Sequence, residues 1–480
     1  MKKYYTLLLA IVVFKAGLGQ GYQISLKTPD FKSGITYLTY YMGSNFNVAD
    51  SAAISNKGTA IFKGASKLPP GIYAIFLPGN RLRVEFLIDK EQVIAVTADT
   101  TDLINKTIIT GSKENILYDQ YQKFASSKGM LIQQERNAYA TSRTKEDSLL
   151  HEKNYNNYNK QLNEYREGII KNQPNSMMAA LLKAMKEPPV PTKVPVTKQD
   201  SLSNYYEYKN HYWDGITFMD DRIIRTPFFL RKLERYYREV LSPASDSIIR
   251  DVDYKLLLAR SAPEMYKFLL NWLTDEYINP KYMGQDAVFV HLFEKYHSKG
   301  LSKWLNESQM DGISRRAYML MSNLIGDKAA DLDMLDVADN PMSLYNVSAD
   351  YTVICFWDPN CGHCKEVVPR LDSIYKASWK QHNVKIFGVL TPDGKADIKP
   401  EWLSFINNHK MTDWVNVYQT KEAEAKNVAE QRPSFRQLYD VSMTPTLFLL
   451  DKEKRIIAKK LTWEQMNDLL EVKWKTPSSN

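Results

Sequence analysis

Short runs of alternating apolar and polar residues dominate positions 21–112 and predict β-strands. These runs are separated by clusters of Gly, Pro, Ser and Asn, the residues that tight turns require. Regularly spaced short strands of this kind are typical of a small β-sandwich, so we predict one over residues 21–112. The expected strands cover residues 35–42, 58–62, 72–76, 81–88 and 93–97.

The pattern changes at residue 113, where long polar segments that are nearly free of Gly and Pro favour helices. We predict an α-helical domain over residues 113–330. Within it, residues 185–200 contain four prolines, and we expect this stretch to be an extended, exposed loop. The expected helices include residues 114–127, 142–171, 228–240, 262–272 and 286–296.

Strand and helix patterns alternate in residues 331–475, which predicts an α/β domain. The order is a βαβ unit, then a β-hairpin and a closing helix. The expected strands cover residues 351–357, 384–390, 414–418, 446–450 and 455–459, and the expected helices cover residues 361–378, 400–410, 434–439 and 463–473.

Residues 1–19 have the features of a secretory signal peptide. Two lysines precede a short apolar run, and Gly17 and Gly19 supply the small residues found before a cleavage site. The run is too short to span a bilayer with ease, and no later segment approaches the length of a membrane span. We therefore expect cleavage after Gly19 and a mature chain in the periplasm or outside the cell. Lys15, just after the run, keeps an uncleaved anchor as the alternative.

The overall composition excludes several classes of protein. With 44% apolar and 25% charged residues, the 480-residue chain resembles ordinary globular proteins. Its formal charge of +8 is mild for this length and includes the lysines of the signal peptide. Basic residues alternate with acidic ones, as at 452–455, so we expect no nucleic-acid partner.

The chain has only three cysteines, which are too few for a disulfide scaffold in an exported protein. A purely structural bond between Cys361 and Cys364 would gain little stability from closing so short a loop. A zinc site needs four ligands, and haem attachment needs a His where Lys365 stands. We therefore expect a redox-active pair, with no metal or other cofactor.

The sequence Phe-Trp-Asp-Pro-Asn-Cys-Gly-His-Cys-Lys at 356–365, followed by Pro369, resembles the active-site strand, turn and kinked helix of thioredoxins. Thr444-Pro445 ahead of a strand resembles the cis-proline loop of that superfamily, and residues 330–344 resemble the opening hairpin of its TlpA/ResA-like envelope branch. The upstream domains resemble β-rich and helical domains of unassigned function in secreted relatives. The resemblance implies a multidomain α+β protein whose N-terminal β-sandwich and central α-helical domain precede a C-terminal thioredoxin-like α/β domain.

The two cysteines of this motif are predicted to have different roles. A Cys in the first turn of a helix lies beside unsatisfied backbone N–H groups, which favour the attacking thiolate form. We therefore predict that Cys361 is the nucleophile and that Cys364 is a more buried resolving thiol. In its charged form, His363 would stabilise the thiolate and make the disulfide a better oxidant. A solvent-facing His363 with no tuning role is the alternative.

The resemblance implies further site residues. Trp357 is expected to shield the site, and Thr444 and Pro445 are expected to line the groove that holds the substrate backbone. Cys355 stands where thioredoxins usually have a buried acid, and we expect a buried structural thiol because its strand is apolar. Asp393 falls where the ResA-like branch has a glutamate, so it is the candidate proton relay. A plain turn aspartate is an equal alternative for Asp393.

These features predict an exported thiol–disulfide oxidoreductase that acts on protein thiols and disulfides with an envelope redox partner. The envelope branch that the chain resembles is more often reductive, which favours a reductase. The Cys-Gly-His-Cys sequence at 361–364 is similar to that of protein disulfide isomerases, which keeps an isomerase or oxidase as the alternative. A third possibility is a cell-envelope binding or scaffolding protein with a vestigial redox domain.

Overall fold

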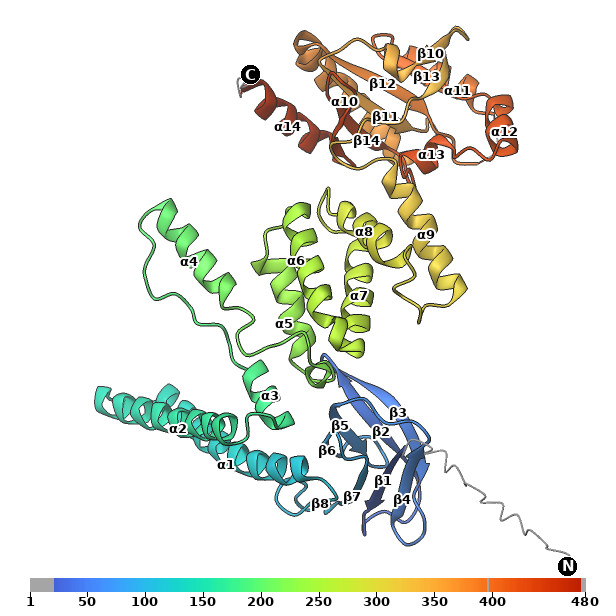
Figure 1. Ribbon diagram of the computed structural model, residues 1–480. Coiled ribbons are helices and arrows are strands. Elements are labelled where there is room, and N and C mark those ends of the chain that lie inside the picture. The colour runs from blue at the N-terminus through green and yellow to red at the C-terminus, as the bar shows by residue number, and fades with distance from the viewer. Residues whose placement is uncertain (1–20, 395–396, 476–480) are drawn as a thin grey trace, which may run out of the picture. The chain divides into compact units, whose positions relative to one another are not determined.

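The computed structural model describes residues 21–394 and 397–475, so the predicted signal peptide lies outside the described residues. The chain forms two compact units. The first extends to Leu241 and includes Lys255–Phe268, and the second consists of Ser242–Tyr254 and the chain from Leu269 onward. The predicted fold class is confirmed, because strands are followed along the chain by helices and then by an α/β domain (Figure 1).

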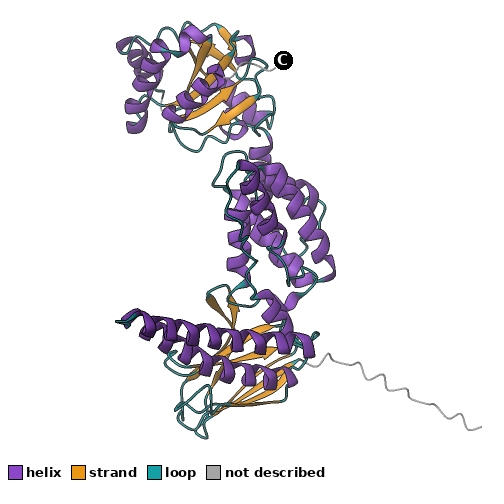
Figure 2. Ribbon diagram, turned by 90° about the vertical axis from the view of Figure 1, so that its left-hand side faces the viewer, coloured by secondary structure: helices purple, strands orange, loops and turns teal. Residues whose placement is uncertain are grey.

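The N-terminal part of the first unit is a β-sandwich built from two four-stranded sheets (Figure 2). Alternate side chains of both sheets share one core, in which Phe62 and Phe86 are fully buried. One sheet has the order β4 (Thr59–Gly64), β1 (Tyr22–Lys27), β7 (Val93–Thr97), β8 (Ile108–Thr110), and the other has the order β3 (Asn45–Ala53), β2 (Ile35–Met42), β5 (Gly71–Phe76), β6 (Arg83–Ile88).

The sequence pattern does not predict β1, β3 or β8. No side chain of β3 is buried, so this edge strand lacks the regular apolar alternation of a half-buried strand. β8 is only three residues long. β1 does alternate, with Ile24 and Leu26 buried between more exposed neighbours, and this signal could have been found in the sequence.

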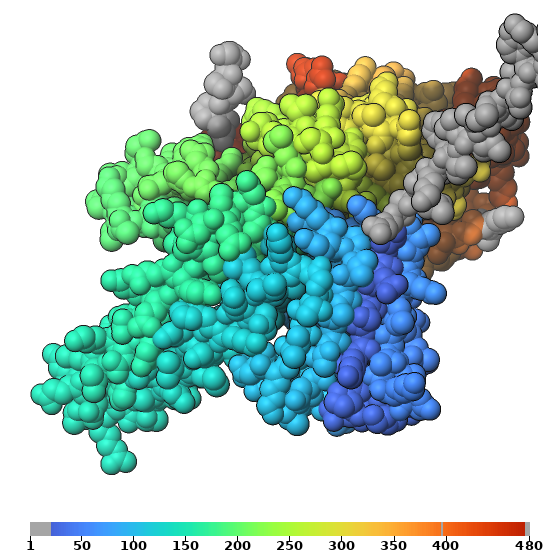
Figure 3. All heavy atoms as spheres, turned by 60° about the horizontal axis from the view of Figure 1, so that its bottom comes forward, coloured from blue at the N-terminus to red at the C-terminus, as the bar shows by residue number. Residues whose placement is uncertain are grey.

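Two long helices follow the sandwich: α1 (Lys113–Thr141) and α2 (Lys145–Asn172). The first turns of α1 pack on the sandwich, where Leu117 and Tyr121 are buried in one cluster with Leu87. Figure 3 shows this pair of helices, in cyan to green, beside the blue β-strands. The sequence predicts a helix end before Gly129, but α1 continues through it. A single Gly lowers helix stability by only about 1 kcal/mol, which a long helix tolerates.

The rest of the helical region is made of shorter helices. The proline-rich stretch is free of regular structure up to residue 197, and α4 begins at Lys198, so the predicted extended loop is three residues too long at its end. The predicted helices at 228–240 and 286–296 each end in a wider π-helical turn. The helices are α3 (Met177–Ala184), α4 (Lys198–Asn210), α5 (Phe229–Arg235), α6 (Ser245–Leu258), α7 (Pro263–Ile278), α8 (Asp286–Leu292) and α9 (Glu307–Met321).

The second unit contains a seven-stranded sheet with the order β10-β9-β13-β12-β11-β14-β15. The central strand β11 is parallel to β12 and antiparallel to β14. The short hairpin of β9 and β10 corresponds to the opening hairpin that the resemblance implies. The strands are β9 (Asp333–Asp336), β10 (Pro341–Ser343), β11 (Tyr351–Trp357), β12 (Val384–Leu390), β13 (Val415–Tyr418), β14 (Thr446–Leu450) and β15 (Ile456–Lys459).

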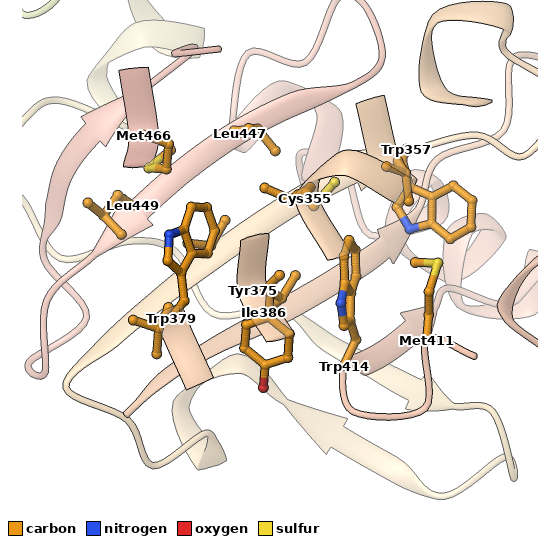
Figure 4. Packing of buried hydrophobic residues seen from close by; sticks show 14 of the residues in the cluster. Cys355, Trp357, Tyr375, Trp379, Ile386, Met411, Trp414, Leu447, Leu449 and Met466 are labelled. Carbon is orange, nitrogen blue, oxygen red and sulfur yellow. The ribbon is translucent and has the colours of Figure 1, made fainter. Parts of the chain in front are cut away.

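Successive residues of β11 face opposite sides of this sheet. Cys355 and Trp357 belong to the cluster packed under α10 (Gly362–Ala377) and α14 (Trp463–Lys475), whereas Phe356 belongs to a second cluster with Tyr439. Figure 4 shows Cys355 inside the first cluster, beside Leu447 of the neighbouring strand. The central strand is therefore covered on both faces, which explains its continuous apolar sequence.

Three shorter helices complete this part of the chain: α11 (Lys399–Asn408), α12 (Lys421–Ala429) and α13 (Phe435–Leu438). The sequence prediction omits α12. Its signals are present, because Thr420 caps the helix by accepting the N–H of Ala423, and the segment is rich in Ala, Glu and Lys.

Candidate active site

The two cysteines of the motif lie at the N-terminus of α10. Cys361 is the N-cap residue, and its sulfur accepts the backbone N–H of Cys364 at 3.4 Å. The sulfur therefore satisfies one of the free backbone donors at the end of the helix where the dipole is positive. Pro369 lies inside the same helix, as the resemblance implies.

The loop before β14 approaches the same sulfur. The Thr444–Pro445 peptide bond is cis, and the S–H of Cys361 donates to the carbonyl oxygen of Thr444 at 3.4 Å. Because β14 pairs with β11, residues 83 positions apart in the sequence meet at this point. The fold thus brings three of the residues singled out in the sequence, Cys361, Thr444 and Pro445, to one place.

The environment of Cys361 favours its thiolate. Partial burial acts to raise the pKa of this thiol, but hydrogen bonds with the backbone and side chain of Cys364, with the side chain of Thr444 and with the backbone N–H of His363 outweigh it. The net result is a pKa below the ordinary value of a cysteine. A larger fraction of Cys361 is therefore in the nucleophilic form at neutral pH.

Cys364 has the opposite environment. Its side chain is fully buried, and burial raises the pKa of Cys364 to about 12. Both cysteines are free thiols in this structure. The pair therefore combines one partly exposed thiol with a lowered pKa and one buried thiol that holds its proton.

His363 is exposed on the first turn of α10. It acts on the Cys361 thiol through its backbone N–H, which lowers the pKa of that thiol. Any residue at position 363 except proline can make this backbone hydrogen bond to Cys361, because only proline lacks the N–H. The predicted effect of the imidazole charge stays a prediction.

Trp357 does not lie on the surface. Its side chain is fully buried, and its ring packs against Phe405 of α11 with the centroids 5.1 Å apart (Figure 4 shows Trp357 within the core). The side chain has no exposed surface to offer a substrate. It supports the strand that leads into the active-site turn.

Asp393 is exposed in the turn that follows β12. Its backbone N–H donates to a carboxylate oxygen of Asp358 at 2.7 Å. The other oxygen of Asp358 accepts the N–H of Asn360 at 2.7 Å. Asp393 is thus anchored to the active-site turn by its backbone, and its proton-relay role remains untested.

Asp358 is a site residue that the sequence analysis missed. Its carboxylate is almost fully buried, and its backbone oxygen accepts the N–H of Cys361 at 3.2 Å. One side chain therefore joins the turn before the nucleophile to the turn that contains Asp393. The Asp-Pro-Asn sequence gave a partial signal, because Asp commonly hydrogen-bonds the backbone two residues on.

Cys355 lies in the core behind the motif. It is fully buried, and burial, together with the nearby Cys364, raises its pKa well above the ordinary value. The position therefore holds a protonated thiol in place of the acid that thioredoxins usually have there.

This geometry agrees with the comparison to protein families. Residues 325–459 match the AhpC/TSA family, and residues 22–118 match DUF4369, a domain of unknown function that covers the β-sandwich. The C-terminal domain belongs to the thioredoxin superfamily. No curated protein matches the chain.

Several solved structures are similar to parts of the chain. A domain of a possible thiol-disulfide isomerase from Cytophaga hutchinsonii is 32% identical and aligns with 33% of this chain and 97% of its own, with a TM-score of 0.28. A thioredoxin-like protein from Bacteroides caccae is 21% identical over 60% of this chain and 98% of its own, with a TM-score of 0.44. A thiol:disulfide interchange protein from a Bacteroides species is 26% identical. The alignment covers 33% of this chain and 95% of that protein, with a TM-score of 0.27.

Neither a metal-ion site nor a membrane-spanning helix is found in the described residues. Within 21–394 and 397–475, no group of His, Cys, Asp and Glu side chains is arranged to hold a metal ion. Nor does any helix in these ranges combine the length and the apolar character needed to cross a bilayer.

Proposed function

We propose that the chain is an exported thiol–disulfide oxidoreductase that reduces disulfides of protein clients. The observation that supports this most directly is the contrast within the motif. Cys361 is partly exposed and has a lowered pKa, while Cys364 is buried and has a pKa of about 12. An exchange enzyme needs one thiol that attacks from the surface and a second that stays protected until a mixed disulfide has formed.

In the first step, the Cys361 thiolate attacks one sulfur of the client disulfide. The client S–S bond breaks, a mixed disulfide forms, and the released client sulfur takes up a proton. In the second step, Cys364 loses its proton and attacks the sulfur of Cys361. The mixed disulfide breaks, the client leaves as a dithiol, and Cys361 and Cys364 become a disulfide. A dithiol partner in the envelope then returns two electrons and two protons to this disulfide.

The second step needs an acceptor for the proton of Cys364, because this thiol is protonated at neutral pH. We propose Asp393 for this role. Its turn is tied by Asp358 to the turn that contains Cys361, which keeps it close to the site. Water entering when the client binds is the competing acceptor.

The client backbone is proposed to lie against Thr444 and Pro445, beside the sulfur of Cys361. The buried Trp357 supports this surface from below by its packing with Phe405. The proposed client groove therefore lies on the thioredoxin-like domain, with Thr444 and Pro445 at its surface and Trp357 beneath them.

Export and the periplasmic or secreted location rest on the leader at residues 1–19. N-terminal sequencing of the protein from its own cells tests this part of the proposal. A mature chain that begins at Gln20 supports export with cleavage, and an intact Met1 in the cytoplasm contradicts it.

An isomerase or oxidase is the second candidate, because the Cys-Gly-His-Cys sequence is similar to that of protein disulfide isomerases. The reduction potential of the Cys361–Cys364 couple decides between them. Reductants of the thioredoxin type have reduction potentials of about −270 mV, and isomerases have potentials of about −180 mV. A potential near the lower value supports the reductase.

Insulin reduction by the mature chain, with dithiothreitol as electron donor, tests the activity itself. We expect turnover by the wild type and none by Cys361→Ser. If the wild type does not reduce insulin or any other disulfide, a binding or scaffolding protein with a vestigial redox domain becomes the better proposal.

A further inference from the structure

A pocket of about 580 Å³ lies in the second unit, outside the cysteine motif. One wall is the loop 279–284, which joins α7 to α8, and another is formed by Arg316 and Leu320 of α9. The thioredoxin-like domain contributes Asp440 and the residues at the end of β15. Helices upstream of the thioredoxin-like domain therefore help to build a surface on it.

This pocket lies near the loop that contacts the nucleophile. Asp440, which lines the pocket, lies four residues before Thr444. Lys460, which also lines it, donates its backbone N–H to the carbonyl oxygen of Leu447 at 2.7 Å, and Leu447 is two residues after Pro445. The ammonium group of Lys460 also pairs with the carboxylate of Asp440. Four extended residues span at most about 14 Å. A client segment that lies against Thr444 can thus reach the pocket within about five residues.

Buried ion pairs hold the walls together. Lys459 is almost fully buried and contacts Asp286 of α8, and its ammonium group donates to the side-chain oxygen of Asn323 at 2.7 Å. Arg316 pairs with the buried carboxylate of Asp440 at 2.6 Å. Removing one partner of such a pair is costly, so the arrangement resists distortion. The pocket is therefore preorganised and does not have to be assembled by its ligand.

The lining of the pocket has an excess of positive charge. Four cations line it, Lys281, Arg316, Lys459 and Lys460, against two carboxylates, Asp286 and Asp440. Arg316 and Lys460 share the single charge of Asp440.

The loop wall supplies one of these four cations, Lys281, together with two apolar side chains. Lys281 forms no ion pair with the described residues, and its ammonium lies 5.8 Å from the centre of the Tyr282 ring. Tyr282 is 50% exposed and Met283 is 48% exposed. The surface thus offers a cation next to accessible apolar area.

We propose that this surface binds the client segment beside the disulfide under attack and selects segments with an acidic residue next to an apolar one. The proposal rests on the exchange activity proposed above and assigns a role in client choice to the loop 279–284. Complementary charge mainly raises the association rate and the discrimination between partners. Lys281 and Tyr282 are then specificity residues that never touch the reacting sulfurs.

The test uses two fluorogenic disulfide peptides that are identical except for Glu or Lys four residues from the cysteine. We expect kcat/KM of the wild type to be about three- to tenfold higher for the Glu peptide, with the difference shrinking as salt is added. Lys281→Glu should abolish or invert this preference. Lys303→Glu is the matched control, because Lys303 is exposed outside the pocket and the change in net charge is the same.

A neutral small disulfide, the dimer of N-acetylcysteine amide, separates the two proposals. Wild type and both variants should reduce it at equal rates. If the wild type fails to reduce it, the proposed function is wrong. If it is reduced but the Glu and Lys peptides react equally, or Lys303→Glu alters the preference as much as Lys281→Glu, the inferred client site is wrong.

Discussion

The backbone N–H of Cys364 points at the sulfur of Cys361 from 3.4 Å, so the second cysteine stabilises the thiolate of the first before either reacts. The residue that we propose as the resolving thiol thus also helps to activate the proposed nucleophile through its main chain. Replacing Cys364 by Ser keeps this N–H and a side-chain hydrogen-bond donor while it removes the sulfur, which makes the two roles separable by mutation.

The first prediction uses this separation to trap clients. Cys364→Ser should keep an active nucleophile and accumulate mixed disulfides, because only the second step needs the Cys364 sulfur. Cys361→Ser should form none, since the remaining thiol is buried and protonated. Non-reducing gels of cells expressing each variant check this, and mass spectrometry of the bands identifies the clients. Equal trapping by both variants would contradict the assignment of the two thiols.

The second prediction concerns pH. Because the pKa of Cys361 is lowered, its alkylation by iodoacetamide should reach half of its maximal rate below the ordinary thiol pKa of about 8.5. Cys364 should remain unmodified over the same range, as its pKa is about 12. Peptide mapping after timed labelling of the reduced protein measures both rates. A midpoint above that of a free cysteine would rule out the activated state of Cys361.

The third prediction separates the two ways in which His363 can act. His363→Pro removes both the imidazole and the backbone N–H that lowers the pKa of Cys361, so the pKa should rise and the couple should become more reducing. His363→Ala removes the imidazole alone and should have the smaller effect. Glutathione redox titration measures both potentials. An unchanged potential in both variants would mean that His363 does not tune the site.

The fourth prediction concerns Cys355. Cys355→Ala should keep exchange activity and lose about 1–3 kcal/mol of unfolding free energy, because it truncates a fully buried side chain. Urea denaturation of the reduced protein measures the loss, and insulin reduction measures activity. Lost turnover with an unchanged unfolding curve would instead give Cys355 a part in the chemistry.

The sequence predicts the central strands well. The bounds of β11, β12 and β14 agree with the expected ranges 351–357, 384–390 and 446–450, because strands that are buried on both faces are continuous apolar runs. The edge strand β3 escapes prediction because none of its side chains is buried. In β11, β12 and β14, the strand propensity of the residues and their burial give the same signal. In β3, no burial pattern accompanies the strand.

From the residue pattern alone, the site was predictable only where its residues are local in sequence, and the distant Thr444 and Pro445 were expected only through the resemblance to thioredoxins. Cys361 and Cys364 follow from their spacing at a helix start. The carboxylate of Asp358 contacts the backbone of Asp393, 35 residues away, and no local pattern contains that contact. The burial of Trp357 depends on its packing against Phe405 of α11, which lies far along the chain and in no local pattern with Trp357.

The hydrogen bond between Cys361 and Thr444 has a consequence for biogenesis. During synthesis, Cys361 emerges more than eighty residues before the Thr444 loop that completes its environment. Contacts between residues so far apart in sequence form late and slowly in folding. A nascent or truncated chain therefore presents both cysteines without the finished site, and full reactivity arises only when the last strands have joined the sheet.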